Sequence, residues 1–526
     1  MHRQSKSPLA VALLIGLAFS TRASAQALEP IVYTVRVPKP DSHAAKIEAV
    51  FPTGGRPDLA IMMAVWSPGF YRVEDYAKRV EDLTAQAPDG TTLKVEHPEK
   101  NRWKVETGGR PKVVVSYKLI CQQASVTTNY VGEALGVFNG AASFITLVEQ
   151  TRRPHEVYFE LPAVWKQTMS ALEAAPDQKP NHYRADDYET LVDSPIVAGN
   201  PSVHEFEVDG SKHLLVDVGT LGQWDGKLAA QEIEKLVQEN RRLWGFLPFK
   251  RYLFLNVFRQ GGGGLEHKNS TLLTASPPRA SYPARNFRWL SFVSHEYFHA
   301  FNVKRLRPIE LGPFDYDHPP NTSSLWISEG FTSYYGDLIV VRAGLGAPQD
   351  FLKQVSSEIE QLQKAPGRLV QSLEQSSLEV WASGTSGFGR SRDKSVNYYV
   401  KGLIVAFLLD AKIQHTSKGK RSLDDMMRLA YKRYGGEKGF TPEQFRLTAQ
   451  EIAGTDLKEW FRKTISSTEE LDYAEALEWY GLRFGPPAAE DSDKEKPAAR
   501  WKLEIREDSS DSQKEHLKKL FSSSGT

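Results

Sequence analysis

The sequence predicts a multidomain α+β protein of roughly three domains: an N-terminal β-sandwich, a central mixed domain and a C-terminal α-helical bundle. Short segments of alternating polar and apolar residues, separated by turn signals, fill the first third of the chain. One apolar segment near the middle carries two histidines at helical spacing, and helical periodicity dominates after Ala347. Since the three patterns occupy different stretches, we expect them to form separate structural units.

Residues 1–25 have the three-part pattern of a secretory signal peptide. Basic residues precede the apolar run Pro8–Ser20, and residues 23–25 are small, as cleavage requires. The apolar run is shorter than the about 20 residues that span a bilayer. We therefore expect a bacterial protein that is exported, either periplasmic or secreted, with no stable membrane span after signal removal. An uncleaved anchor is the alternative.

Charge and cysteine content narrow the functional classes. Lys and Arg number 66 and Asp and Glu 65, so the chain offers no electrostatic basis for binding nucleic acid or an anionic membrane. Cys121 is the only cysteine, which excludes an internal disulfide. An exported protein of this kind must depend on its core and on a metal for stability. We expect Cys121 to be a buried strand residue.

Residues 28–175 are expected to form the N-terminal β domain, which carries no catalytic constellation. Its segments alternate with a period of two, and Gly-containing turns separate them. Ser67–Tyr71 is interpreted as a tight turn. The expected strands are Ile31–Val37, Lys46–Phe51, Leu59–Trp66, Val113–Ile120 and His155–Leu161.

Residues 176–345 are expected to form the central domain. Trp224–Trp244 has the periodicity of an amphipathic helix, and Arg251–Phe258 reads as a buried strand. Four glycines follow at 261–264, where the backbone can approach a ligand closely. No Gly-Lys-Ser/Thr follows them, which argues against a phosphate-binding loop.

The segment HEYFH at 295–299 is the strongest functional signal. Residues four apart lie on one face of a helix, so His295 and His299 can direct two imidazoles at one metal ion. Glu296 can reach a water bound to that ion. Two ligands and a general base at this spacing are typical of zinc metallopeptidases.

Glu329 is the predicted third ligand, because a catalytic zinc site usually has three protein ligands and one open position. It is an acid within the apolar, aromatic stretch 325–335, and a buried carboxylate is costly unless it is paired or bound to metal. We expect one Zn²⁺ per chain, although cobalt or manganese also suits such ligands. Asp337 either supports this site or is merely solvated.

These motifs together resemble the glycyl aminopeptidase family of the gluzincin clan, which also contains thermolysin and the large zinc aminopeptidases. Beyond HEYFH, the resemblance lies in Asn302–Pro308, Leu311–Tyr316 and Ser328–Tyr335. It implies that the central domain is thermolysin-like and catalytic. The zinc ligands that it implies are His295, His299 and Glu329, and the catalytic glutamate is Glu296.

The stretch Gly264–His267 resembles the glutamate-bearing motif with which aminopeptidases of this clan bind the free α-amine of the substrate. The resemblance places the amine on Glu266, with Gly264 and His267 as further substrate-binding residues. His267 stands where the large aminopeptidases have Asn, so it either assists at the oxyanion or holds Glu266. A carboxylate that faces an ammonium restricts cleavage to chain ends.

Residues 346–484 are expected to form the α-helical domain. Within it, Asn397–Gly402 resembles the Tyr-x-Lys-Gly signature of the clan, whose tyrosine stabilises the oxyanion. The resemblance assigns this role to Tyr399, and Tyr398 is the competing choice. The expected helices are Asp350–Lys364, Tyr398–Ile413, Ser422–Tyr434, one that begins at Thr441-Pro442, and Asp456–Ser466.

Residues 485–526 depart from the family, which commonly carries a C-terminal PDZ-type domain. They comprise a charged linker at 490–496 and a short tail, so we expect no full PDZ domain. Within the tail, Leu503–Ile505 has the pattern of a strand and Gln513–Phe521 that of a helix.

The sequence thus predicts a secreted zinc metallo-aminopeptidase that hydrolyses N-terminal residues from peptides with a free N-terminus. A preference for Gly or Ala is implied by the family resemblance alone. The alternatives are a zinc endopeptidase on the same site, a catalytically inactive zinc-binding protein that recognises peptides, and a hydrolase of non-peptide substrates. The oligomeric state is not determined by the sequence.

Overall fold

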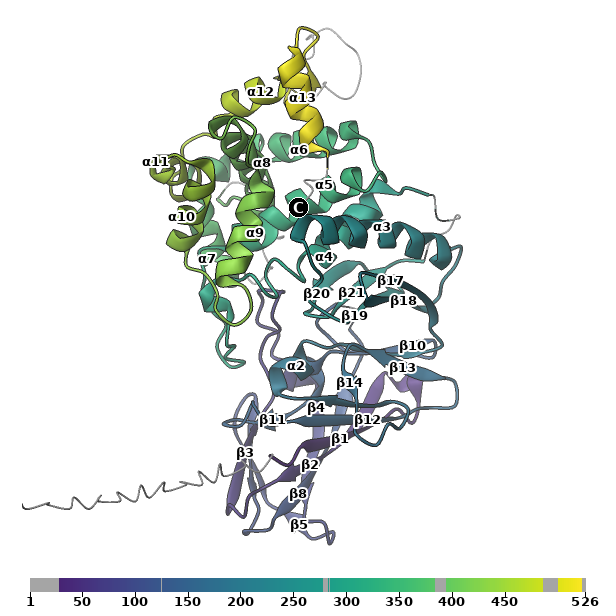
Figure 1. Ribbon diagram of the computed structural model, residues 1–526. Coiled ribbons are helices and arrows are strands. Elements are labelled where there is room, and N and C mark those ends of the chain that lie inside the picture. The colour runs from purple at the N-terminus through teal and green to yellow at the C-terminus, as the bar shows by residue number, and fades with distance from the viewer. Residues whose placement is uncertain are drawn as a thin grey trace, which may run out of the picture.

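The computed structural model describes residues 28–123, 125–277, 282, 284–383, 394–485 and 500–522 (Figure 1). The expected signal peptide and charged linker lie outside these residues. In Figure 1 the β-rich N-terminal part forms one end of the molecule and the helices form the other. The multidomain α+β class is confirmed. Over the described stretches, no helix combines the length and apolar character needed to cross a membrane.

An eight-stranded sheet is the largest element of the N-terminal part, with strand order β14-β15-β12-β1-β2-β8-β4-β5. β1 (Ile31–Arg36) pairs in parallel with β12 (His155–Glu160) and antiparallel with β2 (Ala44–Pro52). Alternate residues of β1 are buried, as a half-buried strand requires. Cys121 is buried, as expected, but it directly follows the strand that ends at Ile120 instead of lying within it. The remaining strands are β4 (Val80–Gln86), β5 (Thr92–Leu93), β8 (Lys112–Ile120), β14 (Glu173–Ala174) and β15 (His182–Ala185).

Two four-stranded sheets complete this part, with orders β11-β3-β7-β6 and β13-β16-β10-β9. Because β15 and β16 belong to the N-terminal sheets, this part continues to Gly199, and the expected boundary after residue 175 falls inside it. Both strands have only four residues, too few to show alternation in the sequence. The strands are β3 (Asp58–Met62), β6 (Val95–Glu99), β7 (Arg102–Glu106), β9 (Tyr130–Val131), β10 (Leu135–Phe138), β11 (Thr146–Leu147), β13 (Gln167–Ser170) and β16 (Ile196–Gly199).

The central part is built on a five-stranded sheet of order β17-β18-β19-β21-β20. The middle strand β19 (Arg251–Phe258) has the bounds expected from the sequence, and it pairs in parallel with both neighbours. β20 (Gly263–Glu266) is an edge strand that carries part of the glycine run. Helix α3 (Gly226–Trp244) is capped by Asp225 and begins two residues after the expected start at Trp224. The other strands are β17 (Ser202–Val208), β18 (Ser211–Gly219) and β21 (Ser270–Ala275).

The HEYFH motif lies at the end of α4 (Phe287–Phe298), with His299 as the C-cap residue, and α5 (Thr332–Arg342) packs against this helix. The π-helical turn η4 (Trp326–Phe331) continues directly into α5, and α8 (Tyr398–Thr416) packs on this turn. Glycines permit the close packing: a Cβ at Gly330 would collide with the backbone of Gly402 on α8.

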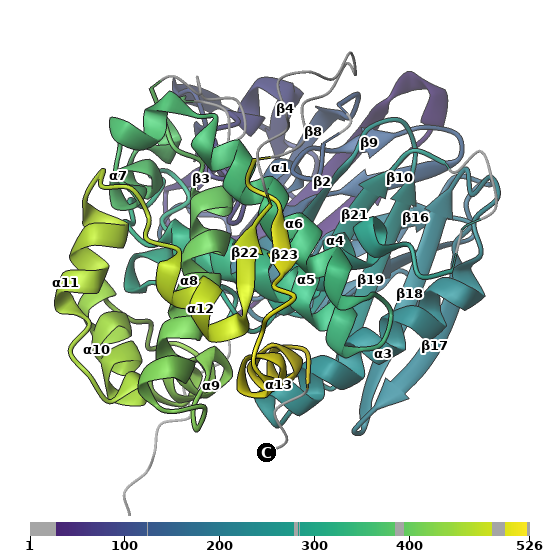
Figure 2. The same ribbon diagram turned by 90° about the horizontal axis from the view of Figure 1, so that it is seen from above.

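The helical domain contains the expected helices, and Figure 2 shows them on the opposite side of the molecule from β17 and β18. Thr441 caps α10 by accepting a hydrogen bond from the Gln444 backbone N–H. The segment expected as one helix over Asp456–Ser466 is α11 followed by a π-helical turn. The helices are α6 (Pro348–Gln363), α7 (Leu373–Leu378), α9 (Leu423–Tyr434), α10 (Pro442–Ala453), α11 (Lys458–Phe461) and α12 (Ala474–Tyr480).

The C-terminal tail packs on the helical domain. β22 (Leu482–Phe484) pairs with β23 (Leu503–Ile505), and α13 (Asp511–Leu520) lies against α12. The Leu503 N–H donates a 2.9 Å hydrogen bond to Ser356 Oγ on α6. Both predicted tail elements are therefore formed, one as a strand of a two-stranded antiparallel sheet and the other as a helix.

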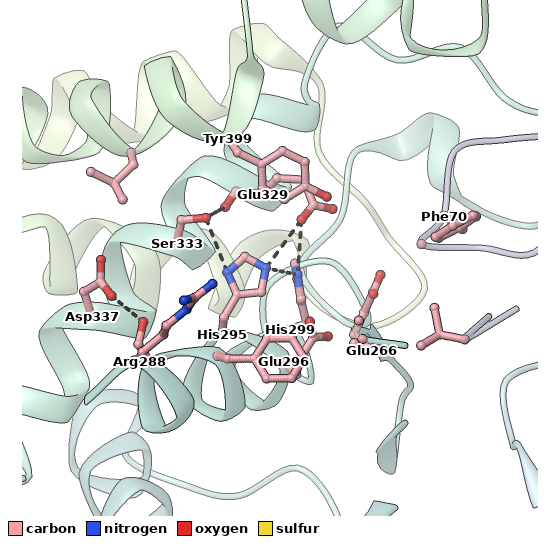
Figure 3. Close-up of a pocket in the computed structure, with 18 of the residues that line it drawn as sticks. Phe70, Glu266, Arg288, His295, Glu296, His299, Glu329, Ser333, Asp337 and Tyr399 are labelled. Atoms are coloured by element: carbon pink, nitrogen blue, oxygen red, sulfur yellow. Dashed lines mark hydrogen bonds and ion pairs between the residues drawn. The ribbon is translucent and has the colours of Figure 1, made fainter. Parts of the chain in front are cut away.

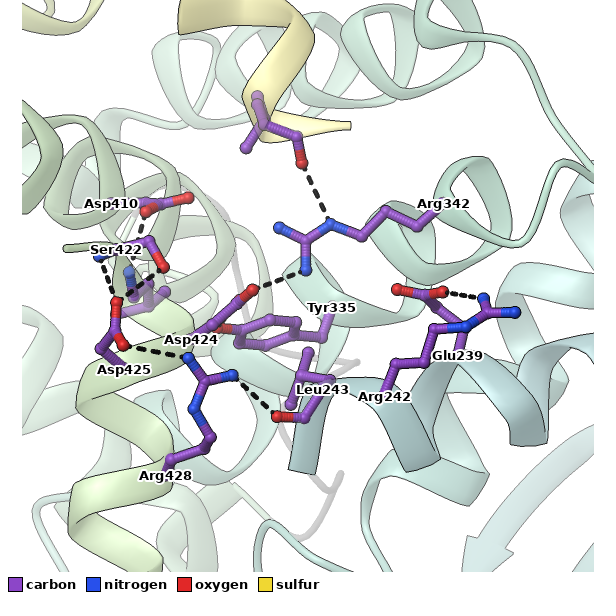
Figure 4. A network of polar contacts seen from close by, with 12 residues as sticks. Glu239, Arg242, Leu243, Tyr335, Arg342, Asp410, Ser422, Asp424, Asp425 and Arg428 are labelled. Carbon is purple, nitrogen blue, oxygen red and sulfur yellow. Dashed lines mark hydrogen bonds and ion pairs between the residues drawn. The ribbon is translucent and has the colours of Figure 1, made fainter. Parts of the chain in front are cut away.

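A buried polar network joins α5, α9 and α13 (Figure 4). Arg342 lies 2.9 Å from Asp424 and donates a 3.0 Å hydrogen bond to the Leu520 carbonyl. The Tyr335 hydroxyl donates to the other oxygen of Asp424 at 2.9 Å. Since every member has a partner, the network fixes the helix that follows the candidate ligand Glu329.

Candidate active site

His295, His299 and Glu329 converge on one point (Figure 3). The two imidazole Nε2 atoms are 3.1 Å apart, and Glu329 Oε2 lies 3.3 Å from His299 Nε2 and 3.7 Å from His295 Nε2. The helix places both histidines on one face, and η4 brings the carboxylate to them from the next element. Across the part of the chain that the structure describes, this is the single group of His, Cys, Asp or Glu side chains that could hold a metal ion.

The outer nitrogens of the two imidazoles also have partners. His299 Nδ1 lies 3.0 Å from the carbonyl oxygen of Asn302. Because a carbonyl oxygen can only accept a hydrogen bond, Nδ1 carries the proton and donates it. That bond leaves Nε2 with its lone pair directed at the common point. His295 Nδ1 lies 3.3 Å from Ser333 Oγ on α5. Both rings are therefore oriented as metal ligands require.

The charges of this group favour a cation. Burial alone would raise the pKa of Glu329, but His299 and His295 outweigh it and lower the pKa to about 2. Burial likewise opposes a charged His299 ring, yet Glu329, Glu266 and Glu296 together raise its pKa to about 10. The three carboxylates thus favour positive charge at the point where the two imidazoles converge. Two imidazoles and a carboxylate are the donor set of a catalytic zinc site.

Tyr71 is a site residue that the sequence analysis missed. Its hydroxyl donates a 3.1 Å hydrogen bond to Glu329 Oε1, the oxygen that faces away from the histidines. The Ser67–Tyr71 segment does turn tightly, with the Phe70 N–H bonded to the Ser67 carbonyl. The same turn orients the candidate ligand, so its interpretation as an ordinary tight turn missed a functional role.

Glu296 faces the cavity from the buried side of α4. Its Oε2 is buried and has no hydrogen-bond partner, and burial raises the pKa of the carboxyl to about 8. Gly264 on edge strand β20 lies directly against it, because a Cβ there would collide with the Glu296 carboxylate. An unpartnered buried carboxyl beside the metal position is available to bind a water.

A cavity of about 560 Å³ surrounds the metal position, and Figure 3 shows Glu266 and Phe70 on one side of the histidines with Arg288 and Asp337 on the other. Asp337 is buried, accepts a hydrogen bond from Ser291, and has its pKa raised to about 7 by burial. It therefore lines the cavity rather than being solvated.

Glu266 is 4% exposed, and no side chain among the described residues donates a hydrogen bond to its carboxylate. Gly69 closes over it: a Cβ at this residue, whose φ is +94°, would lie 2.5 Å from Glu266 Oε1. A buried carboxylate that lines the cavity and accepts no side-chain hydrogen bond suits a cationic group of a ligand.

His267 lies outside the cavity. It is buried, and its Nδ1 is 3.3 Å from Asp193. Of the two alternatives for this residue, the geometry favours support of the Glu266 strand over contact with a reacting oxygen.

Tyr399 lines the cavity, and its ring stacks on His295 with centroids 6.2 Å apart. Burial, followed by the charge of Glu329, raises the pKa of its hydroxyl well above the ordinary value, so the phenol stays protonated as a donor. Tyr398 is 1% exposed and is not among the cavity residues. The structure thus brings Tyr399, rather than Tyr398, to the metal position.

The fold and this site together define a metallopeptidase. The model of the Peptidase M61 N-terminal domain matches residues 32–200, and that of M61 glycyl aminopeptidase matches residues 288–405, together more than half of the chain. The chain belongs to the M61 glycyl aminopeptidase family, as the sequence motifs predicted. A search of curated proteins found no match.

Solved structures share the architecture. An aminopeptidase N family protein from Idiomarina loihiensis has a TM-score of 0.81 at 25% identity, covering 88% of this chain and 80% of that chain. An M1 zinc metallopeptidase from Deinococcus radiodurans has a TM-score of 0.50 at 12% identity, covering 85% and 95%. A mutant of the latter is bound to a Tyr-Ser-Ala substrate and has a TM-score of 0.50 at 13% identity, with the same coverage. The Deinococcus structures show similarity of fold alone.

Proposed function

We propose that this aminopeptidase binds one zinc ion per chain and removes small N-terminal residues, Gly or Ala, from peptides. The observation that carries the proposal is the arrangement in one cavity of three convergent ligands, an unpartnered Glu296 and, to one side of the metal position, a buried carboxylate on Glu266. In that arrangement the three ligands would hold the metal, Glu296 would act as the base, and Glu266 would bind the substrate amine.

His295, His299 and Glu329 would hold the ion through the atoms that already face one another. When bound, zinc polarises the scissile carbonyl and lowers the pKa of a coordinated water to about 7. Tyr71 holds the carboxylate ligand from behind, and Asn302 and Ser333 hold the two rings.

Glu296 moves the proton. Its carboxylate takes a proton from the attacking water and passes it to the nitrogen of the leaving peptide. Burial raises the pKa of this group, which favours its protonated form as the acid that donates to the leaving nitrogen. The Tyr399 hydroxyl, which burial keeps protonated, donates to the oxygen on which negative charge develops.

Glu266 fixes the N-terminus of the peptide and so selects exopeptidase activity. With the ammonium at Glu266, the peptide extends past the metal position toward the Arg288 and Asp337 side of the cavity. Gly69 and Phe70 border the space around Glu266, which supports small first residues.

The test combines zinc content with hydrolysis of Gly- and Ala-para-nitroanilide by the purified mature protein and by Glu296→Gln. We expect both proteins to hold one zinc and the variant to lose about 10³-fold in kcat, the effect of losing a general acid–base group. An N-acetylated substrate should not be cleaved. If both proteins hold zinc and neither cleaves any peptide, the proposal is wrong and a binding role replaces it.

A zinc endopeptidase on the same site is distinguished by Glu266. An endopeptidase has no need of an amine anchor, so Glu266→Ala would leave its activity unchanged and N-acetylated peptides would be cleaved. The carboxylate, buried and without a side-chain donor, favours the aminopeptidase.

We also propose export to the bacterial periplasm or beyond, on the strength of the pattern in residues 1–25. Mass spectrometry of the protein from a periplasmic fraction should show an N-terminus at Gln26. Recovery of the full-length chain from the cytoplasm would contradict this.

A further inference from the structure

Asp193, the residue that follows helix α2 (Tyr188–Val192), reaches behind the amine-binding end of the cavity. Its Oδ1 lies 2.6 Å from the Lys304 ammonium and 3.3 Å from His267 Nδ1. Its Oδ2 accepts a 2.7 Å hydrogen bond from the Lys268 backbone N–H. One carboxylate of the N-terminal part thus holds both the turn after β20 and the segment after the HEYFH helix.

Lys304 is a largely buried cation that lines the same small cavity as Glu266. Its side chain is 9% exposed, and the cavity has a volume of about 30 Å³. Burial opposes the charged form of Lys304, but Asp193 and then Glu266 raise its pKa above the ordinary value. An ammonium of the protein itself therefore interacts electrostatically with the carboxylate that would bind the ammonium of the substrate.

The Lys304 ammonium and the substrate ammonium could both pair with Glu266, and the ion pairs of the structure show which carboxylate Lys304 uses. Among the described residues, Lys304 pairs with Asp193, whereas no side chain donates a hydrogen bond to Glu266. We propose that Asp193 is a positioning residue that holds Lys304 away from Glu266 and so reserves Glu266 for the substrate N-terminus. The inference rests on the proposed function. It adds a residue of the N-terminal part of the chain to those that determine how the substrate N-terminus is bound.

Loss of the Asp193 charge should change the carboxylate with which Lys304 pairs. In Asp193→Asn, Lys304 would be buried without its counter-ion, which is costly. Glu266 is the next carboxylate that acts on it, so Lys304 is expected to pair with Glu266 and to occupy the position of the substrate amine. The Asn side-chain oxygen can still accept from the Lys268 N–H, so the turn after β20 is retained.

The experiment is a double-mutant cycle on the zinc-loaded full chain with Ala-para-nitroanilide. We expect Asp193→Asn to raise KM about tenfold, the value of one charge-assisted hydrogen bond, with kcat changed less than threefold and zinc content unchanged. Asp193→Asn combined with Lys304→Met should restore KM to within about threefold of the parent, because the competing ammonium is gone.

A structural role would give a different pattern. If Asp193 only stabilised the turn, the double variant would be no better than Asp193→Asn, and kcat, zinc content and thermal stability would fall together. Asp187→Asn is the matched control: Asp187 caps the same helix and does not contact Lys304, so its KM should equal that of the parent. Failure of the double variant to recover KM overturns the inference.

Calorimetric binding of L-alaninamide to the same zinc-loaded proteins separates this inference from the proposed reaction. Alaninamide presents the α-amine, and its binding can be measured in a protein that does not hydrolyse peptides. If the parent binds alaninamide and the cycle holds while no peptide is cleaved, the proposed reaction fails and the role of Asp193 stands. If the parent hydrolyses Ala-para-nitroanilide but the Asp193 and Lys304 substitutions change neither KM nor the affinity for alaninamide, only the inference fails. If the parent neither cleaves nor binds, both fail.

Discussion

Two buried polar clusters lie at opposite ends of one helical segment, and they differ in how their charges are satisfied. At the start, Glu329 meets two imidazoles whose nitrogens face each other 3.1 Å apart. At the end, Arg342 pairs with Asp424 at 2.9 Å, and Asp424 also accepts from Tyr335 (Figures 3 and 4). The second cluster is complete within the chain, whereas the first needs a cation.

The difference shows which buried charges serve stability and which serve function. A complete network rigidifies the helix and gains nothing from a ligand, since each member already has its partner. The histidine cluster and its neighbour Glu296 Oε2, which has no partner, retain unsatisfied bonding capacity in a buried place. The complete network therefore provides the rigid support on which the incomplete cluster is built.

The largest expected effect breaks the complete cluster. Asp424→Ala leaves Arg342 buried without a counter-ion, so the free energy of unfolding should fall by about 3–5 kcal/mol in urea titration. The kcat of the remaining folded protein should be within twofold of the parent. Asp425→Ala, on the same helix but half-buried, is the control and should cost about 1 kcal/mol through the lost cap. Equal losses in the two variants would remove the distinction between the clusters.

The next effect concerns the incomplete cluster and leaves the fold intact. Tyr399→Phe removes the proposed oxyanion donor, so kcat should fall by about 10²–10³-fold with little change in KM or melting temperature. Tyr398→Phe alters the neighbouring, fully buried hydroxyl and should retain kcat within about threefold. Steady-state kinetics with Ala-para-nitroanilide distinguishes them, and the reverse order would assign the role to Tyr398.

Removal of the metal should separate activity from folding. A chelator should abolish hydrolysis while the circular dichroism spectrum persists, because the surrounding helices have their own core. Zinc at 100 times its Kd should raise the free energy of unfolding by about 2.7 kcal/mol. Glu329→Gln is expected to lose this response. A zinc-free chain that is unfolded would show that the metal, rather than the core, holds the helices together.

The smallest effect is a pH dependence that involves Asp337. Burial raises its folded-state pKa to about 7 from the ordinary 3.8, so the folded protein binds this proton more tightly than the unfolded chain does. Its contribution to stability is thus fully present below about pH 4 and is lost as pH rises through 7. Asp337→Asn should flatten this decline by about 1–3 kcal/mol between pH 4 and 8 in zinc-free protein. An unchanged slope would mean that another group titrates.

The sequence alone determined the residues whose chemistry depends on local spacing. The turn of a helix places His295 and His299 together whatever surrounds them, and local motifs drew attention to Glu329 and Tyr399. The long strands and amphipathic helices followed from periodicity, since each buries one face. The strands β15 and β16 were not predicted, because a segment of four residues is too short to show a clear alternation of polar and apolar residues.

Only the tertiary structure decided which distant groups complete the site. Tyr71 reaches Glu329 across 258 positions of the chain, and Asp193 reaches Lys304 from the N-terminal part. No local pattern marks such pairs, because a hydroxyl or carboxylate in a loop looks the same in sequence whether it meets solvent or a buried partner. Burial and charge pairing are set when separate elements pack, and packing also placed Glu266 in the same small cavity as a cation that another carboxylate holds.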